Sequence, residues 1–422
     1  MKVGKNLFNN IFVPGLNGIA SFVFWYPFVM SLFWIAGTLV YIWFRDKDQK
    51  IDFAKVDWPL ISFLVPCYNE QDTIEETLDN LLGLDYPRKE IILINDGSKD
   101  NTAALLKRLS QEHPSIRVIQ LYENRGKANA LHLGAHAARG EYLLCLDSDA
   151  ILDNDAPYYL IHHFLHKGER LGAVTGNPRI RNRNTLLSRM QLVEYSSIIG
   201  AIKRTQRILG KVMTVSGVVV AFRKRALLDV GLWDRDMITE DIAVSWKLQQ
   251  RFWDIRYEPR ALCWMLVPES LSGIWKQRVR WAQGGQEVML RHWRVLFRWN
   301  QRRIWIVYIE QWISTFWAFA WVFVTVSLLI TADTFQEMLI WLTFTSFALV
   351  FMSLIQLFIS IQIDSKYDKV KRFYLWASWY PAIYWIVNTG VVISAFPRAI
   401  ASRYKGGYAT WKSPDRGIGR NK

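Results

Sequence analysis

The chain has 422 residues, of which 51% are hydrophobic and 21% charged, and 52 Lys and Arg against 37 Asp and Glu give a net charge of +15. So many apolar residues exclude a disordered protein, and only three cysteines exclude a small disulfide scaffold. The charged fraction argues against a chain that lies wholly in a membrane, so we expect one soluble domain anchored to a bilayer.

The first predicted element is an apolar segment at residues 19–44, which is longer than the roughly 20 residues a helix needs to cross the hydrocarbon core. A cleaved signal peptide would have a shorter apolar region and would end at small residues. This segment ends instead in Tyr41, Trp43 and Phe44. We therefore predict an uncleaved membrane anchor over residues 1–44.

Four short apolar runs follow the anchor and predict β-strands. They are Leu60–Pro66, Ile91–Ile94, Arg117–Leu121 and Glu141–Leu146. Helix-like stretches separate them at Gln71–Leu84, Asn101–Glu112 and Lys127–Arg139. Asp100 and Asn101 suit the cap of the second stretch. Strands that alternate with helices of this length predict βαβ units and a mostly parallel sheet, flanked by helices and buried on both faces.

Acidic residues follow two of these strands. Ligands bind beyond the carboxyl ends of the strands in such a sheet, where Asp96, Asp147 and Asp149 are expected to converge. Two carboxylates one residue apart can hold Mg²⁺ or Mn²⁺ beside a diphosphate, and the cation offsets charge on the leaving phosphate. The alternative interpretation is that these residues only make turns and caps.

Two further clusters have both a structural and a chemical interpretation. The Arg-Gly-Lys sequence that ends at Lys127 is either a diphosphate contact at a helix N-terminus or an ordinary surface turn. Thr239, Glu240 and Asp241 precede a helix-like stretch and suit a helix start. In the chemical interpretation, Asp241 is a general base that takes the proton from an acceptor hydroxyl as it attacks a sugar carbon.

Residues 273–303 form a basic region in which Trp and Leu alternate with Arg, a composition that favours the membrane surface. Within it, Arg280 can make paired bonds to a phosphate, and Trp281 offers a flat face to a sugar ring. Gln277 completes a Gln-x-x-Arg-Trp pattern. The alternatives are a solvated helix face packed on the domain, and an interfacial Trp beside an Arg whose head reaches water.

Three more uncharged stretches, at residues 311–332, 338–363 and 373–397, are long enough to span a bilayer. Trp and Tyr at their ends argue against the alternative of buried core helices. Basic residues place the block 45–303 and the tail 398–422 on the cytoplasmic side, so both ends of the last stretch share a side unless the tail lies outside. A break at Pro381 and Gly390 into a re-entrant or tilted element would reconcile these placements.

Taken together, the acidic and aromatic motifs resemble those of the processive family-2 glycosyltransferases, which include cellulose, chitin and hyaluronan synthases. The order and spacing match from Asp96 to Trp281. Within that family the chain is most similar to the bacterial poly-β-1,6-N-acetyl-D-glucosamine synthases. That likeness rests on Gly176–Arg181, Glu194–Gly200, Lys203–Arg207, Pro259–Trp264, Trp275–Gly285 and Trp411–Gly417.

The resemblance implies a GT-A domain and an inverting, metal-dependent transfer from a UDP-sugar. It implies that Asp96, Lys127, Asp147 and Asp149 contact the donor nucleotide, with Asp149 as the metal ligand, and that Asp241 is the base.

The resemblance further implies that five residues lie near the diphosphate and the acceptor sugar, and that two lie in a gating segment. The five are Thr239, Glu240, Gln277, Arg280 and Trp281, and the two are Trp411 and Arg416.

The implied organisation has five parts. These are an anchor (1–44), a cytoplasmic GT-A domain (45–272), an interfacial region (273–303), membrane segments (304–397) and a basic tail (398–422). The implied donor is UDP-N-acetylglucosamine, with Mg²⁺ or Mn²⁺, and the acceptor is the growing chain of a biofilm exopolysaccharide. The resemblance also implies a multi-pass protein in contact with lipid in the bacterial inner (cytoplasmic) membrane, a small membrane partner subunit, and regulation by cyclic di-GMP.

Three alternatives stay open at this point. One is a related transferase, either a hyaluronan, chitin or cellulose type synthase or an enzyme that adds a single sugar to a lipid carrier. Another is a transporter or channel without catalysis, which would need neither acidic motif. The last is a nucleic-acid-binding protein, suggested by the charge of +15. Membrane topology explains that charge more simply, so we expect no nucleic acid partner.

Overall fold

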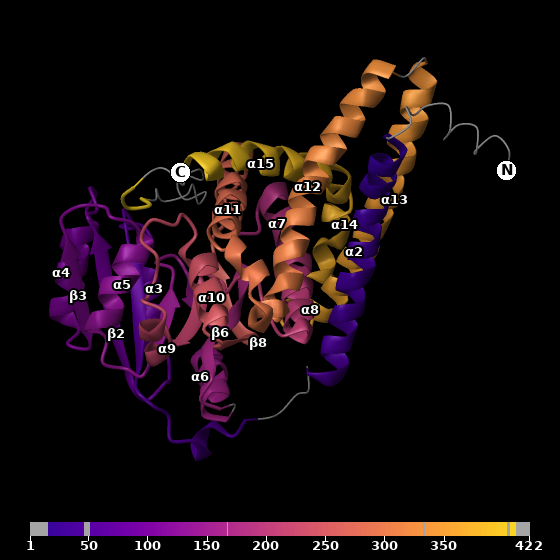
Figure 1. Ribbon diagram of the computed structural model, residues 1–422. Helices are drawn as coiled ribbons and strands as arrows, with labels where there is room; N and C mark the ends of the chain where they lie inside the picture. Colours follow the sequence, from indigo (N-terminus) through magenta and orange to yellow (C-terminus); the bar gives the residue numbers. More distant parts are fainter. Residues whose placement is uncertain (1–15, 46–50, 167, 332–333, 403–405, 411–422) are drawn as a thin grey trace.

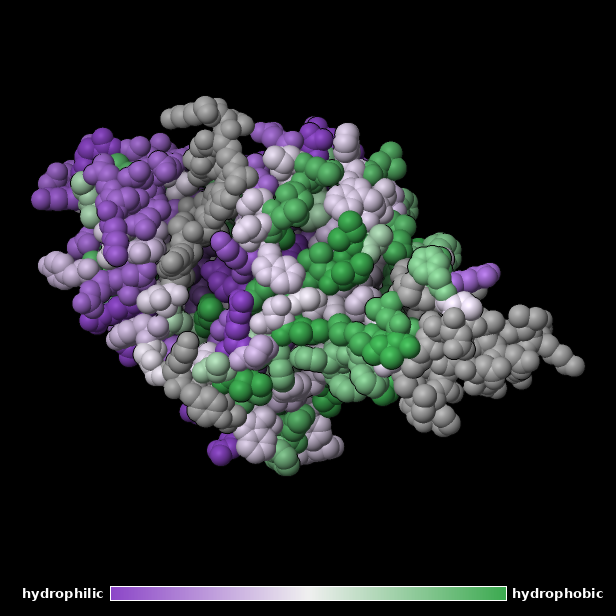
Figure 2. Space-filling model, turned by 90° about the horizontal axis from the view of Figure 1, so that it is seen from above, coloured by the Kyte–Doolittle hydropathy of each residue, from purple (hydrophilic) through white to green (hydrophobic). Residues whose placement is uncertain are grey.

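The computed structural model describes residues 16–45, 51–166, 168–331, 334–402 and 406–410. Figure 1 shows a layered α/β unit built around a sheet, with long helices lying beside it. Hydrophilic residues dominate the surface of the α/β unit in the view from above, whereas hydrophobic residues gather over the long helices (Figure 2).

One eight-stranded sheet lies at the centre of the α/β unit. Its strands are β1 (Ile61–Cys67), β2 (Lys89–Asp96), β3 (Ile116–Leu121), β4 (Tyr142–Leu146), β5 (Ile151–Leu152), β6 (Leu171–Ile180), β7 (Val219–Arg223) and β8 (Asp254–Met265). Their order is β3-β2-β1-β4-β7-β6-β8-β5. The first four strands run parallel, which confirms the prediction, whereas β7 is antiparallel to both β4 and β6.

Helices cover both faces of the sheet, as Figure 1 shows. One face carries α3 (Ile74–Gly83), α4 (Thr102–Glu112) and α6 (Ala156–His166), and the other carries α5 (Lys127–Ala137), α9 (Lys224–Asp229) and α10 (Glu240–Gln250). In β1, Phe63 and Val65 point into the first core and Leu64 into the second, because successive strand side chains alternate. This explains the continuous apolar run of the strand.

The two residues predicted to cap α4 have different roles. Asn101 stands at the cap position without a capping side-chain bond, and Asp100 Oδ1 accepts from the Thr102 backbone N–H at 3.0 Å.

The remaining helices belong to the part beside the sheet. They are α2 (Leu16–Phe44), α7 (Leu186–Tyr195), the π-helical η2 (Ser196–Ala201), α8 (Ile202–Leu209), α11 (Leu271–Arg291), α12 (Arg302–Thr331), α13 (Phe335–Asp364), α14 (Tyr374–Ala377) and α15 (Tyr380–Ser402). Three helical segments of the described chain are long and apolar enough to cross a membrane: Gly18–Phe44, Trp299–Ile330 and Tyr380–Ser402. The described part of α13 adds an apolar segment at Leu349–Asp364.

Helix α15 runs crosswise to α2, α12 and α13 and packs along α11 (Figure 1). The chain before it contacts the α/β unit, because Val370 and Phe373 share a core with Ile180 of β6. The chain after it returns to that unit, where the Ala409 N–H donates to the Arg235 carbonyl at 2.8 Å. Both ends of α15 therefore lie on the side of the α/β unit, as the tilted or re-entrant prediction requires.

The predicted cause of that arrangement was wrong in part. The helix breaks between α14 and α15, and Pro381 lies in the first turn of α15, where the N–H that proline lacks would have no helical partner. It is not broken at Gly390, which lies inside α15. Gly390 instead provides close packing, since a Cβ there would lie 3.1 Å from the ring of Trp275 on α11.

Buried ion pairs join the long helices to the sheet. Asp364, at the end of α13, lies 2.9 Å from the Arg179 guanidinium of β6 and 2.8 Å from that of Arg204 on α8, and all three side chains are at most 2% exposed. Nearby, Asp368 receives two hydrogen bonds from Arg183 at 2.9 and 2.6 Å. On the other side, Arg278 of α11 pairs with Glu194 of α7, which also accepts from the Tyr380 hydroxyl of α15 at 3.1 Å.

Candidate functional site

The loop before α5 closes over the carboxyl end of β2. Asp96 is buried, and its two carboxylate oxygens accept from the backbone N–H groups of Arg125 at 2.9 Å and Gly126 at 2.8 Å. Burial raises the pKa of Asp96, and the two N–H groups oppose that effect because they stabilise the charged form. The Asp96 carboxylate thus fixes the loop that leads into the N-terminus of α5.

Lys127 connects three segments that are distant in sequence. Its ammonium lies 2.6 Å from Asp147 Oδ1 after β4, 3.1 Å from Glu240 Oε1 at the start of α10, and 3.0 Å from the Gly217 carbonyl, to which it donates. Burial alone would lower the pKa of Lys127, but the carboxylates of Asp147 and Glu240 outweigh it and raise that pKa. The ammonium is therefore charged, and it brings the predicted residues of β4, α5 and α10 together.

Asp241 lies at the start of α10, beside this cation. Its Oδ2 accepts from the Gly217 N–H at 3.1 Å and its Oδ1 from its own helix at the Ile242 N–H, at 2.9 Å. Burial, followed by the charge of Glu240, raises the pKa of Asp241 to about 6. A carboxylate with this pKa is ionised at neutral pH and basic enough to accept a proton, which suits a general base.

Asp149 follows β4 on the same sheet edge as Asp147 and is 7% exposed. Between them, the Ser148 hydroxyl is buried without a hydrogen-bond partner among the described residues, and the Ser148 carbonyl accepts from Thr77 at 2.9 Å. Among the residues that the structure describes, no group of three His, Cys, Asp or Glu side chains could hold a metal ion alone. One carboxylate with ligand oxygens completing the sphere suits the way Mg²⁺ binds.

The Gln-x-x-Arg-Trp residues lie on α11, which packs directly against the start of α10. A side chain at Gly284 would overlap Thr239, so the glycine permits this close contact. Gln277 is buried, whereas Arg280 is half-buried and Trp281 is 38% exposed with its ring 6.3 Å from that of Tyr195. Within the described chain, Arg280 has no hydrogen bond or ion pair, so its guanidinium is available to a ligand.

The segment after α15 lies on the loop that Asp96 holds. The Tyr408 ring lies under two guanidinium groups, at 5.4 Å from Arg125 and 5.9 Å from Arg235. Gly126 has a φ of +87°, and a side chain there would overlap the Ala409 carbonyl. The predicted gating residues Trp411 and Arg416 follow directly but lie outside the described residues.

A cavity of about 390 Å³ lies between the long helices and the α7–α8 region, including the loop after α8. Aromatic side chains from α2, α12 and α15 line it: Tyr26, Trp34, Trp317, Tyr380, Tyr384 and Trp385. Polar side chains also line it, among them Gln206, Gln311, Gln356 and Asn388. Flat apolar rings among amide groups suit the faces and hydroxyls of sugar residues.

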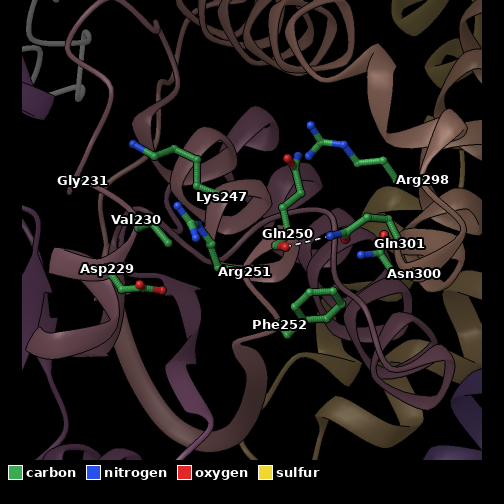
Figure 3. Close-up of a pocket in the computed structure, with 10 residues that line it drawn as sticks. All are labelled: Asp229, Val230, Gly231, Lys247, Gln250, Arg251, Phe252, Arg298, Asn300 and Gln301. Atoms are coloured by element: carbon green, nitrogen blue, oxygen red, sulfur yellow. Dashed lines mark hydrogen bonds between the residues drawn. The ribbon is translucent and has the colours of Figure 1, made fainter.

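A larger, open cavity of about 880 Å³ lies elsewhere, between the end of α10 and the segment before α12 (Figure 3). Arg251, Phe252 and Arg298 line it, and a hydrogen bond of 2.7 Å from the Gln301 side chain to the Gln250 carbonyl forms part of its wall. None of the predicted site residues that the structure describes lines either cavity, but Met213 and Thr214, in the loop that contacts Asp241, line the smaller cavity and not this one, so we do not assign the chemistry to it.

The sequence did not predict three contributors to the site. Gly217 supplies backbone contacts to both Lys127 and Asp241, and Glu194 holds α11 through Arg278. The stretch Lys203–Arg207 pointed to a family likeness but not to the cavity that Lys203 lines. Backbone contacts leave no residue-type signal, so only the fold could reveal Gly217.

The model of the family described as "Glycosyltransferase like family 2" matches residues 59–284, more than half of the chain. The chain belongs to glycosyltransferase family 2. This confirms the family predicted from the motifs, and with the mixed, helix-flanked sheet it confirms the GT-A fold class.

Curated relatives extend the similarity over nearly the whole chain. The chain is 48% identical over 411 residues to a poly-beta-1,6-N-acetyl-D-glucosamine synthase of Staphylococcus epidermidis, covering 94% of this chain and 98% of that one. It is 49% identical, with the same coverage, to the synthase of that name from Staphylococcus aureus strain MSSA476. The three candidate spans, together with the similarity to polysaccharide synthases, indicate association with a membrane.

A solved structure supports the fold. The mannosyltransferase PcManGT from Pyrobaculum calidifontis, in complex with GDP-Man and Mn2+, superimposes with a TM-score of 0.65 at 19% identity. It covers 91% of this chain and 99% of its own.

Proposed function

We propose that the protein is a membrane-embedded, processive, inverting glycosyltransferase that polymerises N-acetylglucosamine from UDP-N-acetylglucosamine into a β-1,6-linked chain. One observation carries the proposal. The Lys127 ammonium joins Asp147 to Glu240, and Asp241 accepts from Gly217 N–H, in the loop whose Met213 and Thr214 line a cavity between the long helices. The 48–49% identity to synthases of this polymer supports the choice of sugar and linkage.

The donor nucleotide would lie at the carboxyl ends of β2 and β4. Asp96 and the loop it fixes would contact the uridine, and Lys127 and Asp147 the nucleotide, with Arg280 free to bond the diphosphate. Asp149, with the unpartnered Ser148 hydroxyl beside it, would hold Mg²⁺ or Mn²⁺ together with diphosphate oxygens. The bound cation would supply charge that stabilises the leaving UDP.

The acceptor would enter from the opposite side, over Trp281. Asp241 would take the proton of the 6-hydroxyl of the terminal sugar as that oxygen attacks the anomeric carbon, and inversion would give the β-linkage. Thr239, packed on Gly284, would fix the start of α10 against α11. The distance between the base Asp241 and the acceptor-binding Trp281 would then stay constant.

The cavity between the helices is the proposed path of the growing chain. Polar groups at membrane depth are tolerated where they line such a path.

The residues 406–410 on the donor loop support a cytoplasmic tail, 398–422, with Trp411 and Arg416 as gating residues. The proposed division is an anchor (1–44), a cytoplasmic domain (45–272), an interfacial region (273–303) and membrane segments (304–397) of a bacterial inner-membrane protein. The small partner subunit and the response to cyclic di-GMP stay predictions from the resemblance.

The test is synthesis by the purified full-length protein in lipid nanodiscs with labelled UDP-N-acetylglucosamine and Mg²⁺ or Mn²⁺. We expect a high-mass polymer that a β-1,6-specific hexosaminidase digests. A resistant polymer would contradict the linkage, and single-sugar lipid products would support the non-processive alternative. Chelation with EDTA should stop UDP release, and added Mg²⁺ or Mn²⁺ should restore it. Activity that persists in excess EDTA would contradict the metal assignment.

A further inference from the structure

Helix α8 is held in place by side chains that each have a fixed partner. Arg204 forms an ion pair with Asp364 at 2.8 Å, and the Thr205 hydroxyl donates to the Trp34 carbonyl of α2 at 2.9 Å. Gln206 accepts from the Met213 N–H at 3.0 Å. These contacts tie α8 to α13, to α2 and to the following loop, so the neighbouring Lys203 projects from a rigid element.

Lys203 differs from its neighbours because its ammonium has no hydrogen bond or ion pair within the described chain. The residue is 6% exposed, and its nearest recorded contact is the Tyr257 ring at 6.0 Å. Burial lowers the pKa of Lys203 to about 8, and the charge of Asp241 opposes that effect. Burying a cation without a partner is costly, so its presence here calls for a ligand that solvates it.

Lys203 lies in the wall of the 390 Å³ cavity, and the charge of the proposed base, Asp241, acts on its ammonium. The loop after α8 lines that cavity at Met213 and Thr214, and the same loop then bonds Asp241 through the Gly217 N–H. The loop 213–217 therefore connects the cavity wall, which includes Lys203, to the base. A sugar that presents a hydroxyl to Asp241 would come within reach of this wall.

We propose that Lys203 binds the terminal sugar of the acceptor chain, a site that rests on the proposed polymerase function. An ammonium offers three hydrogen-bond donors, which suit hydroxyl, ring or amide carbonyl oxygens of an N-acetylated sugar. These bonds orient the sugar so that its attacking hydroxyl faces Asp241. They also give the buried cation hydrogen-bond partners that the described chain does not supply.

The test uses full-length Lys203→Met and Lys203→Arg proteins in nanodiscs, with UDP-N-acetylglucosamine as donor and β-1,6-linked N-acetylglucosamine oligomers as acceptor. We expect Lys203→Met to lower kcat/KM for the oligomer about 10- to 100-fold, the effect of losing hydrogen bonds from a charged group. Affinity for UDP, and UDP release without acceptor, should stay within about twofold. Lys203→Arg, which keeps the charge and donors, should recover part of the loss.

Lys211→Met is the matched control, because Lys211 is another buried lysine just after α8 that does not line the cavity. It should keep wild-type acceptor kinetics. If Lys203→Met leaves kcat/KM for the oligomer unchanged, or lowers UDP affinity equally, the acceptor assignment is wrong. Wild-type protein that makes no polymer from these substrates would instead overturn the proposed function, so the two failures are distinguishable. Elution as a monodisperse peak on size exclusion shows that each variant is folded.

Discussion

At the scale of single residues, the site is organised by charge balance around one cation. Lys127 faces Asp147 and Glu240 directly, and Asp241 stands beyond them with a pKa raised to about 6. Glu240 pairs with the cation, and we propose that this leaves Asp241 for proton transfer. Neighbouring acids in one sequence motif can therefore have different roles, because burial and partners differ between them.

The pH dependence of polymerisation should report Asp241. A base must be unprotonated to act, so kcat/KM should be constant above the raised pKa and fall about tenfold per pH unit below about pH 6. UDP release measured between pH 4.5 and 8 checks this, with circular dichroism at each pH as the control for unfolding. An acid limb that falls near pH 4, the ordinary range of aspartate, would contradict the assignment.

Replacing the base is the complementary experiment. Asp241→Asn keeps the shape of the side chain but cannot accept a proton, so turnover should fall about 100-fold or more. UDP affinity, measured by calorimetry, should change little, because the Lys127 contacts remain. A channel or transporter without catalysis would not lose its function, so an unaffected variant would support that alternative.

The acidic positions of the site could be predicted from sequence because carboxylate side chains are recognisable there. Positions that contribute only backbone groups could not. Asp96, Asp147, Asp149 and Asp241 follow strands or begin a helix, where a carboxylate is recognisable from its place in the pattern. Gly217 contributes only its backbone.

At the scale of elements, the long helices are attached to the sheet through buried charges rather than apolar packing alone. Asp364 forms buried ion pairs with Arg179 and Arg204. Their energy therefore depends on charge compensation in a buried site. The strand and helix periods predicted both elements, but no local signal links Asp364 to arginines more than 150 residues away.

Removing Asp364 should be strongly destabilising. Asp364→Ala leaves two buried guanidinium groups without a counter-charge, for which a loss of about 3–5 kcal/mol is expected. The measurement is the midpoint of thermal aggregation of the detergent-purified protein. Glu76→Ala is the control, since Glu76 is 62% exposed in its pair with Arg181, and exposed pairs contribute about 0.2–1 kcal/mol. Equal midpoints for the two variants would contradict this prediction.

At the scale of the whole molecule, both ends of α15 return to the α/β unit, whereas the adjoining ends of α12 and α13 project away from it (Figure 1). Composition predicted an apolar stretch there but could not set its direction. That direction depends on packing against α11 and on the contacts of Val370, Phe373 and Tyr408. Basic residues flank the stretch on both sides, and the prediction from them that both ends share the cytoplasmic side stays a prediction.

Cysteine labelling in right-side-out cells tests this topology. The native Cys67, Cys145 and Cys263 are free and buried, so background labelling should be low. A cysteine at Lys371 or at Tyr408 should react with an impermeant maleimide only after the membrane is opened, whereas one at Thr334 should react in intact cells. Labelling of the Tyr408 position in intact cells would show that α15 crosses the bilayer once.

The buried charges between the sheet and its neighbours also limit how the molecule can be divided. A soluble fragment cut after residue 272 would lack the partners of Glu194, Arg179 and Arg204, all of which lie further along the chain. Such a fragment would expose these charges in an otherwise apolar surface and should not fold independently. Inhibitor screening and crystallisation therefore require the intact polypeptide in a lipid environment, however complete the motifs of the excised portion look.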